Sequence, residues 1–394
     1  DNGAAAGIEP VARHPGEARG HRPSRGASGI DHGPPARSEP CAARRTTADA
    51  GPAARFAALD LGTNNCRLLV AEPRGRGFRV VDGFSRVVRL GENLTRSGRL
   101  SDEAMERALV ALSICRAKIE AADVKGARLV ATEACRAASN GPDFMERVRA
   151  EAGLSLEVID RATEARLAVA GCAPLIDRRA DGAVLFDIGG GSSEIVWVDL
   201  TGRHRLMGTA LTRCIRAWTS LPVGVVTLAE RHGGGSVDAA LFEDMIEDVE
   251  AMLARVGRSG LDDVVRHGDV HLLGTSGTVT TLAGVYLGLE RYDRRQVDGT
   301  WLDRDDVDRL IDQVVRMTFD ERCANPCIGA DRADLVLAGC AILEAIRRRW
   351  PCRRLRVADR GLREGMLMEL IERDELERRR SLRRNGAPAG AAPR

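Results

Sequence analysis

The stretch from residue 183 to residue 198, AVLFDIGGGSSEIVWV, decides the fold. An apolar run ends at Asp187, three consecutive glycines follow, and a second apolar run starts at Glu194, which is the pattern of strand, tight turn and strand. Because glycine lacks a Cβ atom, backbone N–H groups can converge here on an anion, and Ser192 adds a hydroxyl. The turn is typical of a phosphate site, although an ordinary hairpin also uses glycine where φ is positive.

The same pattern occurs a domain's length earlier in the chain. Residues 55–60 form an apolar run that ends at Asp60, the turn Leu61-Gly-Thr-Asn-Asn65 follows, and a second strand is expected over 66–72. A repeated unit of strand, Asp, glycine turn and strand predicts two related α/β halves that bring their turns to one shared cleft. The repeat favours phosphate binding over two unrelated hairpins.

Three further features could serve a phosphate site. Arg136 follows a strand expected over 127–131, where a guanidinium can bind a phosphate with two hydrogen bonds. Glu164 falls in the first turn of a helix expected from about Thr163, where the helix dipole favours the ionised carboxylate. A third turn, Gly274-Thr-Ser-Gly-Thr278, follows a strand expected over 270–273. Each feature alone is also common in proteins that bind no phosphate.

Composition limits the classes of function. The 394 residues carry 59 basic and 57 acidic side chains, a net charge of +2, which excludes a strongly polycationic protein and gives no indication of a nucleic acid polymer as partner. Lys118 and Lys125 are the two lysines, so arginine abundance is a property of the whole chain and does not mark a site. The phosphate loop that requires Gly-Lys-Ser or Gly-Lys-Thr is also excluded.

Cysteine and apolar patterns bear on redox state and location. The ten cysteines are scattered without a C-x-x-C pair, and no His follows Cys323 and Cys327, so we expect reduced core thiols and no zinc site. No apolar run is long enough to cross a membrane, and the start lacks the apolar segment of a secretory signal. We therefore expect no membrane association and a cytoplasmic location.

The expected organisation has two domains between two irregular ends. Residues 1–54 carry seven of the fifteen prolines and few aliphatic side chains, so we expect a disordered leader. The predicted segments after it are an N-terminal domain over 55–161, a second domain over 162–362, a C-terminal helix over 363–384 that packs back on the first domain, and a disordered tail over 385–394.

Six motifs, taken in order, resemble those of the exopolyphosphatase and guanosine pentaphosphate phosphohydrolase family. The family belongs to the superfamily of actin, sugar kinases and heat-shock ATPases, so the resemblance implies an α/β fold of two actin-like, ribonuclease-H-like domains around a phosphate cleft. The motifs are Asp60-Leu-Gly-Thr-Asn64, Ala131-Thr-x-x-x-Arg136 with Asn140, Glu164-Ala-Arg166, Asp187-Ile-Gly-Gly-Gly-Ser-x-Glu194, Ser276-Gly-Thr-Val279 and Gly361-Leu-Arg-Glu-Gly365.

The resemblance also implies roles for individual residues. Glu164 matches the family's catalytic glutamate, which directs water at the terminal phosphorus, and Asp187 and Glu194 match residues that hold Mg²⁺, with Mn²⁺ as an alternative. Phosphoanhydride hydrolysis needs mainly positioning and charge neutralisation, which agrees with these roles. The residues expected at the phosphates are Asp60, Gly62, Thr63, Asn64, Arg136, Gly189, Gly190, Gly191, Ser192, Ser276, Gly277 and Thr278.

Some positions depart from the family pattern. Thr163 stands where a carboxylate commonly precedes Glu164, and Asn65 replaces a Ser. The chain also lacks the His-Asp type helical region of larger members, so it resembles a short form in which a homodimer could supply grip on long substrates.

Three functions stay open from the sequence. The first is an exopolyphosphatase that releases orthophosphate from inorganic polyphosphate, and the second is a pppGpp 5′-phosphohydrolase. The third, motivated by Thr163 and Asn65, is a catalytically weak sensor that binds polyphosphate or a nucleotide. A sugar-kinase-like phosphotransferase shares the fold but lacks the Glu164-Ala-Arg motif.

Overall fold

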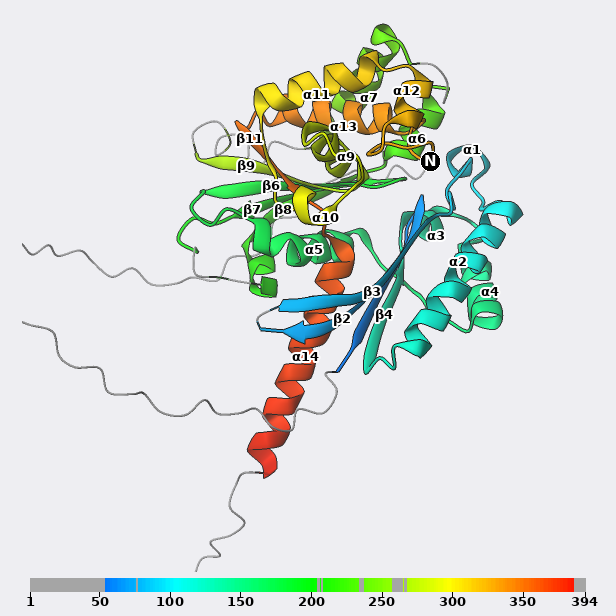
Figure 1. The fold of residues 1–394 in the computed structure, drawn as a ribbon, viewed down its shortest axis with the longest axis vertical. Coiled ribbons are helices and arrows are strands. Elements are labelled where there is room, and N and C mark those ends of the chain that lie inside the picture. Colours follow the sequence, from blue (N-terminus) through cyan, green and yellow to red (C-terminus); the bar gives the residue numbers. More distant parts are fainter. Residues whose placement is uncertain are drawn as a thin grey trace, which may run out of the picture.

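A computed structural model describes residues 54–75, 77–203, 206, 208–233, 237–256, 265 and 268–385, with side chains up to residue 381. Apart from their inner ends, the predicted leader (1–54) and tail (385–394) lie outside these residues. The described chain forms two lobes, each built on one β-sheet, and a long helix, α14 (Leu362–Asn385), descends from their junction along the lower lobe (Figure 1).

The lower lobe in Figure 1 contains a five-stranded sheet in the order β3-β2-β1-β4-β5, with α2 and α4 beside it. A short π-helical turn, Val148–Ala152, extends α4. The elements are β1 (Phe56–Leu61), β2 (Asn65–Arg74), β3 (Gly77–Val87), α1 (Leu94–Ser97), α2 (Asp102–Ala121), β4 (Gly126–Ala131), α3 (Glu133–Ala137), α4 (Gly141–Arg147) and β5 (Glu157–Val158).

The upper lobe contains a six-stranded sheet in the order β10-β11-β9-β6-β7-β8, covered by α7, α9, α11 and α13. Helix α5 runs along the junction of the lobes. The elements are α5 (Arg161–Cys172), β6 (Gly182–Ile188), β7 (Ser193–Asp199), β8 (Ile215–Leu221), α6 (Val225–Arg231), α7 (Ala239–Arg255), β9 (Val270–Thr275), α9 (Gly277–Tyr286), α10 (Arg294–Val297), β10 (Trp301–Asp303), α11 (Arg304–Arg316), α12 (Phe319–Ala324), α13 (Val336–Arg349) and β11 (Arg354–Ala358), with 3₁₀ turns at Ala173–Leu175 and Gly208–Cys214.

The two sheets repeat one topology. In the first, β1 pairs antiparallel with β2 and parallel with β4, and β2 pairs antiparallel with β3. In the second, β6 pairs antiparallel with β7 and parallel with β9, and β7 pairs antiparallel with β8. Each sheet therefore carries its glycine turn between the first two strands of a meander, so the predicted duplication of α/β halves is confirmed.

Some expected boundaries were wrong. Helix α5 begins at Arg161 and not near Thr163, because the Asp160 side chain accepts a hydrogen bond of 2.7 Å from the Thr163 N–H and caps the first turn. Strand β3 ends at Val87, and two residues later Arg89 takes a positive φ of 45°, which turns the chain. Strands β8 and β10 were not expected.

Two glycines allow α14 to approach α5 closely. A Cβ atom on Gly365 would lie 2.1 Å from the Leu167 carbonyl oxygen, and one on Gly171 would lie 1.9 Å from the carbonyl oxygen of Gly361. Leu167 also packs with Met366 and Leu367 in the buried cluster beside β1. This contact holds α5, which carries Glu164, against α14, and α14 in turn packs on β1 of the first sheet.

Candidate active site

The two glycine turns meet where the lobes face each other. A Cβ on Gly190 would lie 3.0 Å from Thr63 Cβ and 3.1 Å from the Asn64 nitrogen, so the turns touch through their backbones. Behind the second turn, a Cβ on Gly224 would lie 2.4 Å from the Gly190 carbonyl carbon. Only glycine permits this approach at 224, and at 190 a side chain would make a tighter contact than is usual, so both positions favour glycine.

One cavity between the lobes collects the predicted residues. Its walls include the catalytic candidate Glu164, the two metal candidates Asp187 and Glu194, and every phosphate candidate except Arg136. The phosphate candidates along the cavity are Asp60, Gly62, Thr63, Asn64, Gly189, Gly190, Gly191, Ser192, Ser276, Gly277 and Thr278. Residues that lie far apart in the sequence thus share one site.

Arg136 does not line the cavity, but it contacts Glu164, which does. Its Nη1 atom is 2.8 Å from Glu164 Oε2, while the same nitrogen donates a hydrogen bond of 2.5 Å to the Ile159 carbonyl. Glu164 Oε2 is buried and accepts no aligned hydrogen bond. The carboxylate is therefore held by charge, and this oxygen keeps a lone pair for another donor.

Buried carboxylates surround the turns. Burial raises the pKa of Asp60, and burial also raises that of Asp187 to about 6, with nearby Arg67 opposing both shifts. Burial and Asp187 raise the pKa of Glu194, although its Oε1 accepts hydrogen bonds of 2.9 Å from Ser192 and 2.8 Å from Ser220. Such a concentration of acids favours a cation among them.

The environment of the cavity also raises the pKa of Glu164. Burial, followed by repulsion from Glu194, raises its pKa, and Arg136 works in the opposite direction. A carboxyl with a raised pKa is a stronger proton acceptor once it is ionised, which suits a general base. Because Asp60 also contributes repulsion, neutralising charge in the cavity would favour the ionised form.

The carboxylates of the cavity suit a Mg²⁺ ion that shares its ligands between protein, substrate and water better than they suit a metal ion bound by protein ligands alone. Within the described ranges no three His, Cys, Asp or Glu side chains are close enough to form a complete metal group. Mg²⁺ is commonly held by one or two carboxylates together with substrate phosphates and water. Asp187 and Glu194, paired across β6 and β7, are a donor set of that kind.

The third turn is strained at the cavity. Ser276 has a φ of 113°, which is rare for a residue with a side chain, and its buried Oγ has no hydrogen-bond partner. It precedes α9, whose free N–H groups begin at Gly277. Backbone strain of this kind concentrates at functional sites, because the surrounding fold must enforce it.

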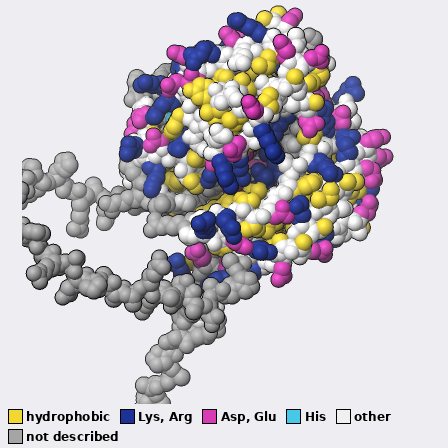
Figure 2. All heavy atoms as spheres, in the orientation of Figure 1, with side chains coloured by type: hydrophobic (Ala, Val, Ile, Leu, Met, Phe, Trp, Pro, Cys, Tyr) yellow, Lys and Arg dark blue, Asp and Glu magenta, His cyan; other side chains and the backbone are white. Residues whose placement is uncertain are grey.

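Sequence reasoning missed four charged residues at the cleft. Arg67, paired across the strands with Asp60, and Arg332 line both this cavity and an adjoining one, Arg363 lines the adjoining cavity, and Glu133 lines the first. Burial lowers the pKa of Arg363. Figure 2 shows Lys and Arg side chains gathered around a hollow between the lobes. The pairing of residues 60 and 67 could have indicated Arg67, because they are neighbours in a hairpin closed by the predicted turn.

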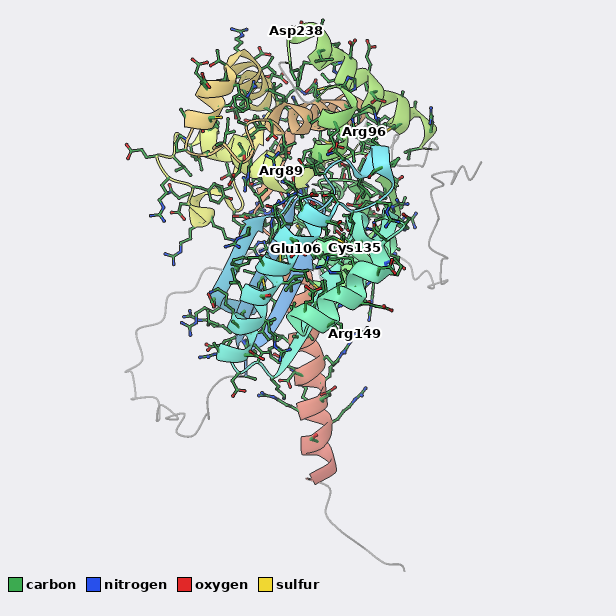
Figure 3. All side chains as sticks on the ribbon, turned by 90° about the vertical axis from the view of Figure 1, so that its right-hand side faces the viewer. Arg89, Arg96, Glu106, Cys135, Arg149 and Asp238 are labelled. Atoms are coloured by element: carbon green, nitrogen blue, oxygen red, sulfur yellow. The ribbon has the colours of Figure 1, made fainter. Side chains whose placement is uncertain are left out.

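The lobes are also joined beside the turns. Arg89 lies at their junction (Figure 3), and its Nη1 is 2.9 Å from Asp334 Oδ2. The Asn93 N–H donates a hydrogen bond of 2.7 Å to Glu230 Oε1. Arg89 also donates its backbone N–H to the Asn64 carbonyl, so the loop that bridges the lobes supports the first glycine turn.

No helix among the described residues is long and apolar enough to span a membrane.

Comparison with curated proteins finds exopolyphosphatase 2 of Mycobacterium tuberculosis, 28% identical over 335 residues that cover 80% of this chain and 98% of that protein.

Similar solved structures also include Ppx/GppA proteins and an exopolyphosphatase. A crystal structure of the Aquifex aeolicus member of the Ppx/GppA family has a TM-score of 0.65 and 28% identity, covering 82% of this chain and 99% of that one. An exopolyphosphatase from Cytophaga hutchinsonii has a TM-score of 0.71 and 25% identity, covering 81% and 98%. The predicted actin-like α/β fold is confirmed. The Ppx/GppA phosphatase family matches residues 69–374, and the chain therefore belongs to that family, as its motifs predict.

Proposed function

We propose that this phosphatase is an exopolyphosphatase that releases orthophosphate from the end of inorganic polyphosphate. The observation that carries the proposal is the buried carboxylate of Glu164, which lines the same cavity as the glycine turns and whose Oε2 lies 2.8 Å from Arg136 Nη1. Two relatives that cover at least 80% of this chain carry the name exopolyphosphatase. A terminal phosphate in this cavity would bring phosphorus, water and a carboxylate together.

The roles follow from the chemistry of the walls. The N–H groups of Gly62 and Gly189 close the two turns by donating to the Asn65 and Ser192 carbonyls, so the backbone N–H groups at 63–64 and 190–191 are the ones that can hold the phosphate oxygens, without reorganisation during the reaction. Glu164 takes a proton from the attacking water while the water oxygen forms the new P–O bond. The bond to the bridging oxygen breaks, and the shortened chain leaves with that oxygen's negative charge.

Asp187 and Glu194 would hold Mg²⁺, with Mn²⁺ as an alternative. When bound, the ion supplies charge neutralisation at the phosphate oxygens. The raised pKa values of Asp187 and Glu194 support this assignment, because among the residues that the structure describes no cationic side chain lies within ion-pair distance of either carboxyl. Ser192 and Ser220 fix the Glu194 carboxylate by hydrogen bonds and leave its second oxygen available.

A screen of phosphate release tests the proposal. Purified full-length protein with Mg²⁺ is assayed against tripolyphosphate, long-chain polyphosphate and pppGpp, and kcat/KM is compared. The proposal expects the highest value for a polyphosphate. A higher value for pppGpp would assign the chain as a pppGpp 5′-phosphohydrolase, and tight binding without turnover in Mg²⁺ or Mn²⁺ would indicate the sensor.

A further inference from the structure

Four charged side chains form a continuous chain of contacts that ends on Glu164. Arg161 Nη2 donates a hydrogen bond of 2.9 Å to Glu133 Oε1, and Glu133 Oε2 accepts hydrogen bonds from Nε and Nη2 of Arg136. Arg136 then contacts Glu164 through its remaining nitrogen. The charges alternate along this chain, and their sum is zero.

Glu133 occupies an unfavourable place for a lone anion. It lies in the first turn of α3, lines the active-site cavity and is 12% exposed. A Cβ on Gly191 would lie 3.2 Å from Glu133 Cγ, so this side chain reaches across the cleft to the triple-glycine turn. An uncompensated carboxylate there would repel the phosphate that the turn is built to hold.

The geometry also explains how Arg136 is oriented. Glu133 binds two nitrogens of the guanidinium, and the Ile159 carbonyl binds the third. These contacts fix the plane of the guanidinium and place Nη1 at Glu164 Oε2. Without Glu133, Arg136 would keep its contacts with Ile159 and Glu164 but lose the bidentate contact that fixes its plane.

We propose that Glu133 and Arg161 are positioning residues, in which Glu133 orients Arg136 on Glu164 and Arg161 cancels the charge of Glu133 beside the phosphate turn. The assignment rests on the proposed phosphoanhydride hydrolysis. Neither residue needs to touch the substrate. Their separate tasks predict opposite effects on phosphate affinity when each is neutralised, which two purely structural ion pairs would not produce.

The test compares Glu133→Gln, Arg161→Gln and the double variant. Isothermal titration with inorganic phosphate measures affinity in the presence of Mg²⁺, and tripolyphosphate turnover gives kcat and KM. Arg161→Gln should weaken phosphate binding and raise KM about fivefold, because it leaves one uncompensated negative charge near the anion. Glu133→Gln should bind phosphate at least as tightly as the wild type, while kcat falls about tenfold.

The double variant restores neutrality, so its phosphate affinity should return to within about twofold of the wild type while kcat stays low. Glu133→Asp, which keeps the charge, should retain wild-type affinity and serves if Glu133→Gln folds poorly. Glu106→Gln is the matched control, because Glu106 is 62% exposed and pairs with Arg147 outside the cavity. It should change neither constant.

The outcomes separate this inference from the proposed function. If the affinities change as expected and no substrate is hydrolysed by the wild type, exopolyphosphatase activity is wrong and the charge-cancelling role stands. If the wild type hydrolyses polyphosphate but both single variants weaken phosphate binding equally, or the double variant adds their losses, the positioning assignment is overturned.

Discussion

Replacing Asp187 by Asn should stabilise the metal-free protein at neutral pH. Asp187 lies one residue before the end of β6, among the buried carboxylates at the glycine turns, and burial raises its pKa from 3.8 to about 6. The folded protein therefore binds this proton more tightly than the unfolded chain does. The resulting stability is present below about pH 4 and is lost as the pH rises through about 6.

The size of the effect follows from the pKa difference. A rise of about two units corresponds to about 3 kcal/mol of destabilisation once the carboxyl is ionised, since one unit is worth about 1.4 kcal/mol. Asn removes that charge with nearly the same shape. Asp60 repels the ionised Asp187 carboxylate, so the substitution also removes this repulsion. We expect Asp187→Asn to raise the free energy of unfolding by about 1–3 kcal/mol at pH 8, or Tm by ~5 °C.

Thermal or urea unfolding in EDTA between pH 4 and pH 8 measures this effect. Asp312→Asn is the control, because the Asp312 side chain is 70% exposed and should change stability by less than ~0.5 kcal/mol at any pH. The stabilisation by Asp187→Asn should shrink toward zero near pH 4. A variant no more stable than the wild type at pH 8, or equally stabilised at both pH values, would refute the electrostatic account of the site.

Three other predictions concern the same cavity. Gly224→Ala should unfold at a lower temperature and lose most activity, because its Cβ would meet the Gly190 backbone at 2.4 Å, whereas Gly77→Ala, with nothing within 4 Å, should change neither by a measurable amount. EDTA should abolish phosphate release and added Mg²⁺ should restore it, as measured by a continuous phosphate assay, while the circular dichroism of the fold stays unchanged. Saturating Mg²⁺ should raise Tm of the wild type and leave Tm of Asp187→Asn nearly unchanged in scanning calorimetry, because the variant lacks one of the two carboxylates.

The fold could be predicted because its decisive features are local. An apolar strand that ends in Asp and a glycine turn specifies a hairpin by itself, and the repeat of that unit at Asp60 and Asp187 indicates two related halves. The same reasoning placed Glu164 in the first turn of a helix, although the helix starts earlier than expected. These inferences needed only neighbouring residues and short-range periodicity.

The rest depends on contacts between distant parts of the chain. Nothing near Gly224 in the sequence indicates that it lies against Gly190, because the pairing of β8 with β7 brings the chain back to the turn. Arg136 was expected at the phosphates, and in the structure its guanidinium contacts Glu133 and Glu164, which line the cavity. Nearly all basic residues of this chain are arginines, so the sequence around any one of them does not indicate which carboxylate it will contact.

The most direct test of the account is polyphosphate hydrolysis by Glu164→Gln in saturating Mg²⁺. The substitution keeps the shape of a side chain that is 11% exposed and removes its ability to accept a proton from water. We expect kcat to fall by about 10²–10⁴-fold, with Tm and orthophosphate affinity close to those of the wild type. Full retention of phosphate release by a correctly folded Glu164→Gln protein would contradict the assignment of Glu164 as the base.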